Sequence, residues 1–139
     1  MAAELLALWR AILSGSTRSL FALLAELDLS LTQLKLLHVL VECETEVSIK
    51  ELAEGLSMSL PNASRTIDGL LQRGLVERRE DEHDRRIKRV GPTPAARELI
   101  DRVDTARLQG LESWAAALTP GQRETLLAAL SSLPKESAS

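Results

Sequence analysis

The side chains of this sequence that could do chemistry are mostly basic and stand in the middle of the chain. Arg85, Arg86, Lys88 and Arg89 come almost consecutively. Residues 65–89 contain eight of the 17 lysines and arginines but only six of the 20 acidic residues. This segment therefore has a formal charge of +2, whereas the whole chain has −3. Such a distribution favours contact between one face of an acidic molecule and a polyanion.

Other kinds of chemistry have little support in the sequence. Cys43 is the only cysteine, which excludes an internal disulfide framework and any multi-cysteine zinc site. Its acidic neighbours disfavour a reactive thiolate, so a redox role is the less favoured alternative. His38 and His83 lack the spacing of a metal-ligand pair, and the sequence has neither a glycine-rich phosphate loop nor a nucleophile elbow. We therefore expect no enzymatic activity, no metal and no cofactor.

The composition is that of one folded, mainly helical domain. The chain has 139 residues, of which 45% are hydrophobic and 27% charged, and this balance excludes a mostly disordered protein. It contains no tyrosine, one phenylalanine and two tryptophans, so its core must be built from leucine, alanine, isoleucine and valine. No apolar run approaches the ~20 residues that span a bilayer. Because the N-terminus also lacks a basic leader, we expect a cytoplasmic protein with no membrane contact.

Apolar residues at helical spacing predict the elements that would position the basic side chains. Helices are expected at about 4–27, 34–42, 49–56, 60–73, 93–118 and 119–133. The apolar spacing of the first is interrupted near Ser14-Gly15-Ser16. Ser48 and Glu51 have the spacing of a capping box, and Ser59 can cap the helix at 60–73. Gly74 suits the left-handed position that ends this helix.

After Gly74 the apolar spacing becomes alternating. Residues 75–79 and 86–90 can pair as two strands, joined by a polar loop. Two short helices followed by a hairpin form a winged helix-turn-helix, in which the second helix fits the major groove of DNA. We therefore expect a mainly α fold with a two-stranded β-wing, flanked by N- and C-terminal dimerisation helices.

The middle of the chain resembles the MarR family of regulators, particularly its SlyA-like branch. The resemblance rests on Leu75-Val76-Glu77-Arg78-Arg79, Asp84-Arg85-Arg86, Val90 and Thr93-Pro94, and upstream on Ser48, Glu51-Leu52-Ala53, Leu56, Arg65 and Gly74. It covers about residues 29–100. It implies a dimeric transcription factor, typically a repressor, that releases a pseudo-palindromic operator on binding a small aromatic or anionic effector.

The resemblance also assigns roles to individual residues. It places the recognition helix at about Leu60–Arg73, and the residues expected to face DNA are Ser59, Asn62, Ser64, Arg65 and Thr66. In the wing, Asp84 would hold the loop in shape while Arg86 reaches the double strand, with Arg85 and Lys88 adding affinity. Pro92 and Ala96 replace a leucine and a glycine that the family usually shows, and Gly69 stands where a longer polar side chain is common.

Three alternatives remain for these residues. Arg65 could form a surface salt bridge with Asp68, three residues along the helix. Asp84 could simply offset nearby positive charge. The basic hairpin as a whole could be an ordinary solvated strand pair.

The terminal segments contain more leucine and alanine than one small core can absorb. We expect residues 1–28 and 93–139 to pack across a two-fold axis of a homodimer around a DNA-binding region at 29–92. The dimer contacts are expected at Leu5, Trp9, Ile12, Leu111, Trp114, Leu126 and Leu130, with both tryptophans as buried anchors. Two recognition helices would then lie ~34 Å apart. The alternatives are a monomer with a helical cap, and a winged-helix dimer that binds protein without binding DNA.

Overall fold

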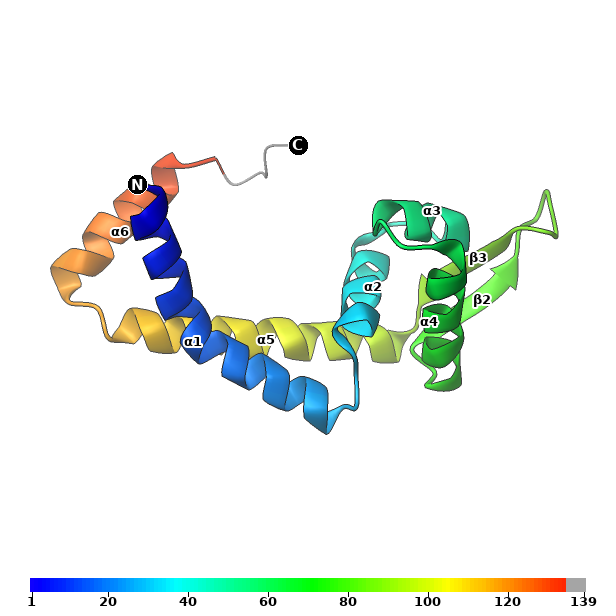
Figure 1. The fold of residues 1–139 in the computed structure, drawn as a ribbon, viewed down its shortest axis with the longest axis horizontal. Coiled ribbons are helices and arrows are strands. Elements are labelled where there is room, and N and C mark those ends of the chain that lie inside the picture. Colours follow the sequence, from blue (N-terminus) through cyan, green and yellow to red (C-terminus); the bar gives the residue numbers. More distant parts are fainter. Residues whose placement is uncertain (135–139) are drawn as a thin grey trace. The chain divides into compact units, whose positions relative to one another are not determined.

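The computed structural model of the chain describes residues 1–134, and it describes the side chains of all of these except 15 and 16. The last five residues of the predicted segment 93–139 lie outside this range. The chain forms two compact units. The terminal unit consists of Met1–Leu20 and Ala106–Ser139, and the central unit consists of Phe21–Thr105. Helices α1 (Ala2–Glu26) and α5 (Pro94–Ala116) each contribute residues to both units (Figure 1).

The helices of the central unit begin at three serine caps. Helix α2 (Leu31–Glu42) is capped by Ser30, helix α3 (Ile49–Gly55) by Ser48 and helix α4 (Leu60–Gln72) by Ser59. The capping box predicted for Ser48 is present, and Ser30 forms a second one with Gln33. Gly74 has a φ of 69° directly after α4, so it adopts the left-handed conformation expected of it. The predicted helix-turn-helix is therefore confirmed.

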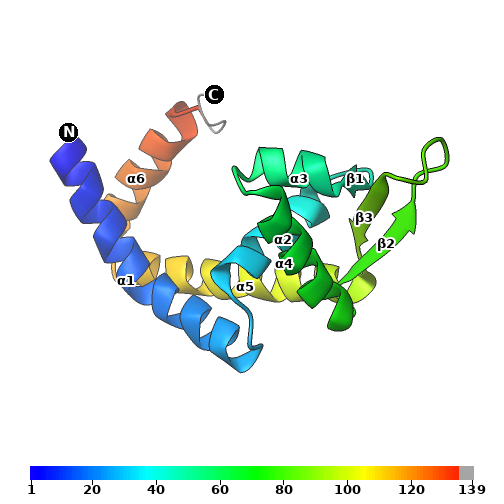
Figure 2. The ribbon, with the colours of Figure 1, turned by 45° about the vertical axis from the view of Figure 1, so that its right-hand side comes forward.

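The wing is part of a three-stranded antiparallel sheet, whereas the sequence predicts two strands. Strands β2 (Val76–Glu80) and β3 (Lys88–Pro92) form the expected hairpin, and β1 (Val47–Ser48) pairs with the other side of β3. In the central unit, Figure 2 shows the hairpin extending beyond the helices. Strand β1 has only two residues, too few to show an alternating pattern. Its pairing places Val47 opposite Val90, which is fully buried.

The core of the central unit holds one face of α4 and leaves the other face free. Its largest fully buried side chains are Leu36, Leu37 and Leu40 of α2, Ile67 and Leu70 of α4, Val90 of β3 and Val103 of α5. On α4, Ala63, Ile67 and Leu70 are each 0% exposed, and they repeat at helical spacing. Because the core fixes this face of α4, the polar residues between them point outward.

The terminal unit contains the remaining parts of α1 and α5, together with helix α6 (Pro120–Ser132), which begins at a capping box of Thr119 and Gln122. Helix α1 is continuous through residues 14–16, where the apolar spacing of the sequence is interrupted. One helical glycine costs about 1 kcal/mol relative to alanine, which the flanking turns of a 25-residue helix can offset. Within residues 1–134, no helix is both long and apolar enough to cross a membrane.

Little of the terminal unit is buried in a single protomer. Helix α6 has no buried residue at all among its 13, all of which are described. Trp114 is half-buried, and Trp9 is 58% exposed. Neither tryptophan is buried in one protomer, and their burial in a dimer stays a prediction.

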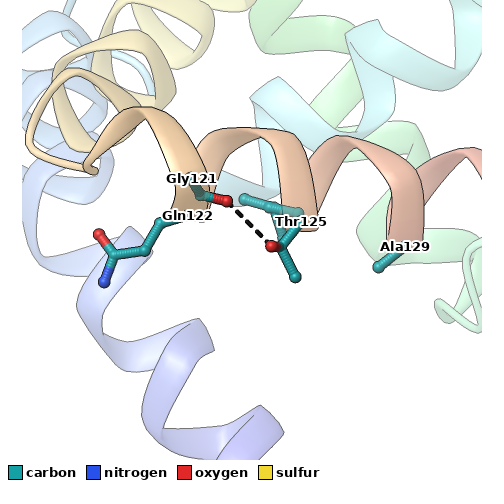
Figure 3. A pocket seen from close by; sticks show the side chains of 5 residues that line it. Gly121, Gln122, Thr125 and Ala129 are labelled. Carbon is teal, nitrogen blue, oxygen red and sulfur yellow. Dashed lines mark hydrogen bonds between the residues drawn. The ribbon is translucent and has the colours of Figure 1, made fainter.

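A shallow hollow runs along α6 and is lined by residues of that helix only (Figure 3). The Thr125 hydroxyl, which lines it, donates a hydrogen bond to the backbone carbonyl of Gly121 at 2.9 Å.

Candidate nucleic-acid interface

The outward face of α4 presents polar side chains to solvent. The Ser59 hydroxyl accepts a hydrogen bond from the backbone N–H of Asn62 at 3.3 Å, which fixes the start of the helix. Asn62 and Arg65 are exposed, and Ser64 and Thr66 are half-buried. The Thr66 hydroxyl donates to the backbone carbonyl of Asn62 at 2.9 Å. Its single hydrogen is thereby used, and its methyl group and oxygen lone pairs remain available to a ligand.

Arg65 does not form the salt bridge with Asp68 that was its alternative assignment. Asp68 instead pairs with Arg78 of strand β2, with 3.4 Å between Oδ1 and Nη1. Within residues 1–134, the Arg65 side chain has neither an ion pair nor a hydrogen bond. Its five N–H donors are therefore free to bind an acceptor outside the protomer. Arg78 had no predicted role, because its partner lies 10 residues away on another element.

The tip of the wing is shaped by two aspartates. Asp84 accepts from the backbone N–H of Arg86 at 3.0 Å, from its Nε at 3.1 Å and from its Nη2 at 3.2 Å. Asp81 Oδ2 accepts from the backbone N–H groups of His83 and Asp84, at 3.0 and 3.1 Å. The side chains of Arg85 and Arg86 are each 91% exposed. The tip is thus folded by its carboxylates while both arginines stay at the surface.

Ion pairing also determines the charge states at the tip. The hydrogen bond from the Arg86 side chain, followed by that from its backbone N–H, lowers the pKa of Asp84 below its usual value. The side chain of Arg89, followed by the N–H groups of His83 and Asp84, does the same to the pKa of Asp81. Both groups are therefore carboxylates at neutral pH, and they balance part of the positive charge of the hairpin.

The basic run splits into an outer pair and an inner pair. Lys88 Nζ lies 2.8 Å from Glu80 Oε1. Arg89 is only 28% exposed and bridges Asp81 and Glu51, at 3.0 and 3.2 Å. The structure therefore brings Arg85 and Arg86 together at the tip, while Lys88 lies lower on the strand against Glu80. Sequence order alone does not show this division, because the acidic partners stand eight and 38 residues away.

A polar cavity of ≈ 450 Å³ lies beside the wing, and it is lined mainly by charged groups that already pair with one another. Arg79 contacts Glu46 there, and Arg89 contacts Asp81. In the part of the chain that the structure describes, no three histidine, cysteine or acidic side chains are grouped to hold a metal ion. We therefore assign no ligand to this cavity.

The residues predicted for the dimer contact lie on the uncovered surfaces of the terminal unit. Leu5, Trp9, Leu111 and Leu130 are between 41% and 59% exposed. An apolar groove of ≈ 540 Å³ is lined by residues of α1, α5 and α6, including Ile12, Leu111, Trp114, Leu126 and Leu130. One protomer alone leaves this groove open to solvent.

Comparison with known proteins agrees with this architecture. A model of the MarR family matches residues 27–87, which span α2, α3, α4, β2 and the wing loop and end just before β3. A crystal structure of the S. aureus MepR–DNA complex is 21% identical and has a TM-score of 0.76, and the match covers 90% of this chain and 93% of that one. YusO from Bacillus subtilis is 20% identical, with a TM-score of 0.72 and coverage of 96% and 93%.

A third similar structure is a transcriptional regulator of the MarR family from Silicibacter pomeroyi. It is 27% identical, with a TM-score of 0.58, and the match covers 89% of this chain and 83% of that one. The matched segment holds the capped helix-turn-helix and the Asp-x-Arg loop of the wing. The chain is thus a winged-helix protein with long terminal helices, and its residues 27–87 are similar to the MarR family.

Proposed function

We propose that this chain is a sequence-specific DNA-binding transcriptional regulator that acts as a homodimer. The observation that carries the proposal is the outward face of α4, where Arg65 has no partner within residues 1–134 and lies on the same helix as Asn62 and Thr66. An α-helix fits the major groove, and these side chains can donate to and accept from base edges. Arg85 and Arg86, at the tip of the wing, would bind phosphates or the adjacent minor groove.

The proposed dimer would cover the apolar surface of the terminal unit. Soluble monomers rarely expose large contiguous apolar patches, whereas α6 buries none of its residues and borders an open apolar groove. A second copy of the chain could occupy that groove symmetrically. The operator would then be a near-palindrome with half-sites about one helical turn apart.

Selection of bound fragments from the source genome, followed by fluorescence anisotropy at two salt concentrations, tests the proposal. The selected DNA should be a near-palindrome, and its affinity should fall steeply with salt as counterions return to the phosphates. Absence of binding even at low salt would favour the alternative, a winged-helix dimer that binds protein.

The dimer has a separate test in Leu130→Glu, which places a charge in the groove. Analytical ultracentrifugation should show the wild type as a dimer and the variant as a monomer. Leu31→Glu is the matched control, because Leu31 is similarly exposed, at 56% against 51%, but lies in the central unit. An unchanged mass for Leu130→Glu would contradict this interface.

We further propose that the dimer acts in the cytoplasm, where bacterial DNA lies, that it represses transcription and that a small aromatic or anionic effector releases it. The similarity of residues 27–87 to the MarR family supports these points. A reporter placed downstream of the selected operator should become more active when the gene for this chain is deleted. Titration of the complex with benzoate, as an aromatic anion, tests the release. Lower reporter activity in the deletion strain would identify an activator instead.

A further inference from the structure

Arg73 connects the recognition helix α4 to the end of helix α1. It caps the C-terminal end of α4. Its Nη1 donates a hydrogen bond to the backbone carbonyl of Asp28, and its Nη2 donates one to the carbonyl of Leu27. These residues directly follow α1 and lie 45 and 46 positions away in the sequence. A single side chain therefore connects the ends of two helices.

The two carbonyls that Arg73 binds are those that the end of α1 leaves free. Helix α1 ends in a Schellman arrangement, in which Asp28 has a φ of 50° and donates its N–H to the carbonyl of Ala25. The N–H of Leu29 reaches back to the carbonyl of Leu24, and both leucines are buried. The motif leaves the last carbonyls unsatisfied at the negative end of the helix dipole, where a guanidinium is favoured.

The turn that follows Arg73 is tied to a second long helix. The Thr93 hydroxyl donates to the carbonyl of Gly74 at 2.8 Å, and the N–H of Thr93 donates to the carbonyl of Leu75 at 3.2 Å. The same hydroxyl accepts from the N–H of Ala96 in the first turn of α5, at 3.3 Å. Residues 73–75 are therefore held by the end of α1 and by the start of α5.

Helices α1 and α5 are the two helices that contribute residues to both units of the chain. The contacts of Arg73 and Thr93 thus hold the end of α4 against α1 and α5, the two helices that also carry residues of the proposed dimer contact. In a dimer, the position of each recognition helix relative to these helices determines which half-site spacing the pair can match.

We propose that Arg73 is a positioning residue that orients α4 against the end of α1 and so sets the half-site spacing that the dimer accepts. The inference rests on the proposed function. Arg73 need not touch DNA in this role. Without its two hydrogen bonds, the C-terminal end of α4 would be held less firmly against the end of α1, so the dimer would bind its best operator less tightly and tolerate altered spacing better.

The test compares Arg73→Ala with the matched control Arg102→Ala. Arg102 is an exposed arginine of α5 whose Nη2 lies 3.5 Å from Glu26 Oε1 on α1. It therefore also reaches α1, but within residues 1–134 it makes neither a hydrogen bond nor an ion pair with α4. Dissociation constants are measured on the selected operator and on versions with one or two base pairs inserted between the half-sites. The spacing penalty is the dissociation constant on an operator with inserted base pairs divided by the dissociation constant on the selected operator.

We expect Arg73→Ala to reduce the spacing penalty by at least about fivefold, the lower end of typical couplings between sites. Arg102→Ala should keep the wild-type penalty, and Arg73→Lys, which retains the charge but not the fork, should fall between them. Weaker binding with an unchanged penalty would overturn the proposal, because a merely stabilising residue would act in that way.

Thermal melts identify a variant that does not fold. If Arg73→Ala is unfolded, the spacing penalty of Arg73→Lys decides the question by the same comparison. If the wild type itself fails to bind the selected DNA at low salt, the proposed function falls first.

Discussion

Asp84 binds Arg86 through both of its carboxylate oxygens, yet the Arg86 side chain remains 91% exposed. An exposed ion pair of this kind contributes little to stability, because solvent screens it. Asp84 therefore orients the Arg86 guanidinium, while Nη1 and both faces of the group stay accessible to solvent.

Arg86→Ala should weaken binding to every DNA sequence by a similar factor. Because the contact expected for a wing arginine is with phosphate, its loss should also reduce the slope of affinity against salt by about one counterion. Anisotropy titrations on operator and random DNA at several salt concentrations measure both effects. Arg18→Ala removes the same charge from α1 and serves as the control. Unaltered affinity for Arg86→Ala would count against the assignment of the wing.

Arg65→Ala should instead reduce the discrimination between operator and random DNA. If Arg65 makes one good bidentate contact with a base, the loss is about 1–3 kcal/mol, and it appears on the operator alone. The free guanidinium of Arg65 is the structural basis for this expectation. Gel-shift titrations on both DNAs provide the measurement. Equal losses on the two DNAs would reject a role in base reading.

Thr66 should recognise a thymine methyl or an amino donor, because its hydroxyl hydrogen is used within α4. Thr66→Val keeps a methyl of the same shape, whereas Thr66→Ser keeps only the hydroxyl. If the methyl contact dominates, the valine variant should retain the operator preference and the serine variant should lose it. Replacing thymines of the operator by uracil, one at a time, should weaken the wild type at one position and leave the serine variant unaffected there. A serine variant with wild-type preference would disprove the methyl contact.

Acid should destabilise the wing in a defined pH range. The pKa values of Asp81 and Glu51 are both lowered in the folded chain. The largest cause for Asp81 is the hydrogen bond from the Arg89 side chain, and the largest cause for Glu51 is the hydrogen bond from the backbone N–H of Ser48. Carboxyls of this kind stabilise the fold above their unfolded pKa of about 4, and the contribution is lost as the pH falls through the folded value. Urea unfolding of Asp81→Asn should therefore show lower stability at neutral pH and a smaller further decrease in acid. A decrease as large as that of the wild type would mean that Asp81 is not responsible.

The sequence predicts those parts of the fold that depend on neighbouring residues, such as helical apolar spacing and helix caps. The helices at α2, α3 and α4 show apolar spacing and serine caps, and Gly74 marks the end of α4 by its conformational freedom. The capping box at Ser30 could also have been found, since Gln33 stands three residues later. These features depend on residues within one or two turns of each other, so the linear pattern contains them.

The parts that sequence reasoning missed depend on contacts between distant segments. Strand β1 exists only because β3 offers an edge to Val47 and Ser48. The division of the basic run follows from Glu51, which reaches Arg89 from α3, 38 residues away. Arg73 reads in the sequence as one more surface arginine at a helix end. Its partners are backbone carbonyls, which every residue has, so the residue types at positions 27 and 28 do not indicate the contact.

Gly69→Ala should stabilise the protein without changing its affinity for the operator. Gly69 lies inside α4 with a helical backbone, and an added Cβ would meet only the side-chain nitrogen Nε2 of Gln33, at 3.5 Å. This is ordinary contact, so the substitution should gain about 0.5–1 kcal/mol of helix stability. The new methyl would lie beside the Gln33 side chain of α2, on the same face of α4 as Arg65, which stands four residues earlier. Gly55→Ala is the matched control, since its Cβ would meet nothing within 4 Å at the end of α3. Urea unfolding and anisotropy on the same samples give both quantities. Greater stability together with weaker operator binding would contradict the prediction and show that DNA approaches the backbone of α4 at Gly69.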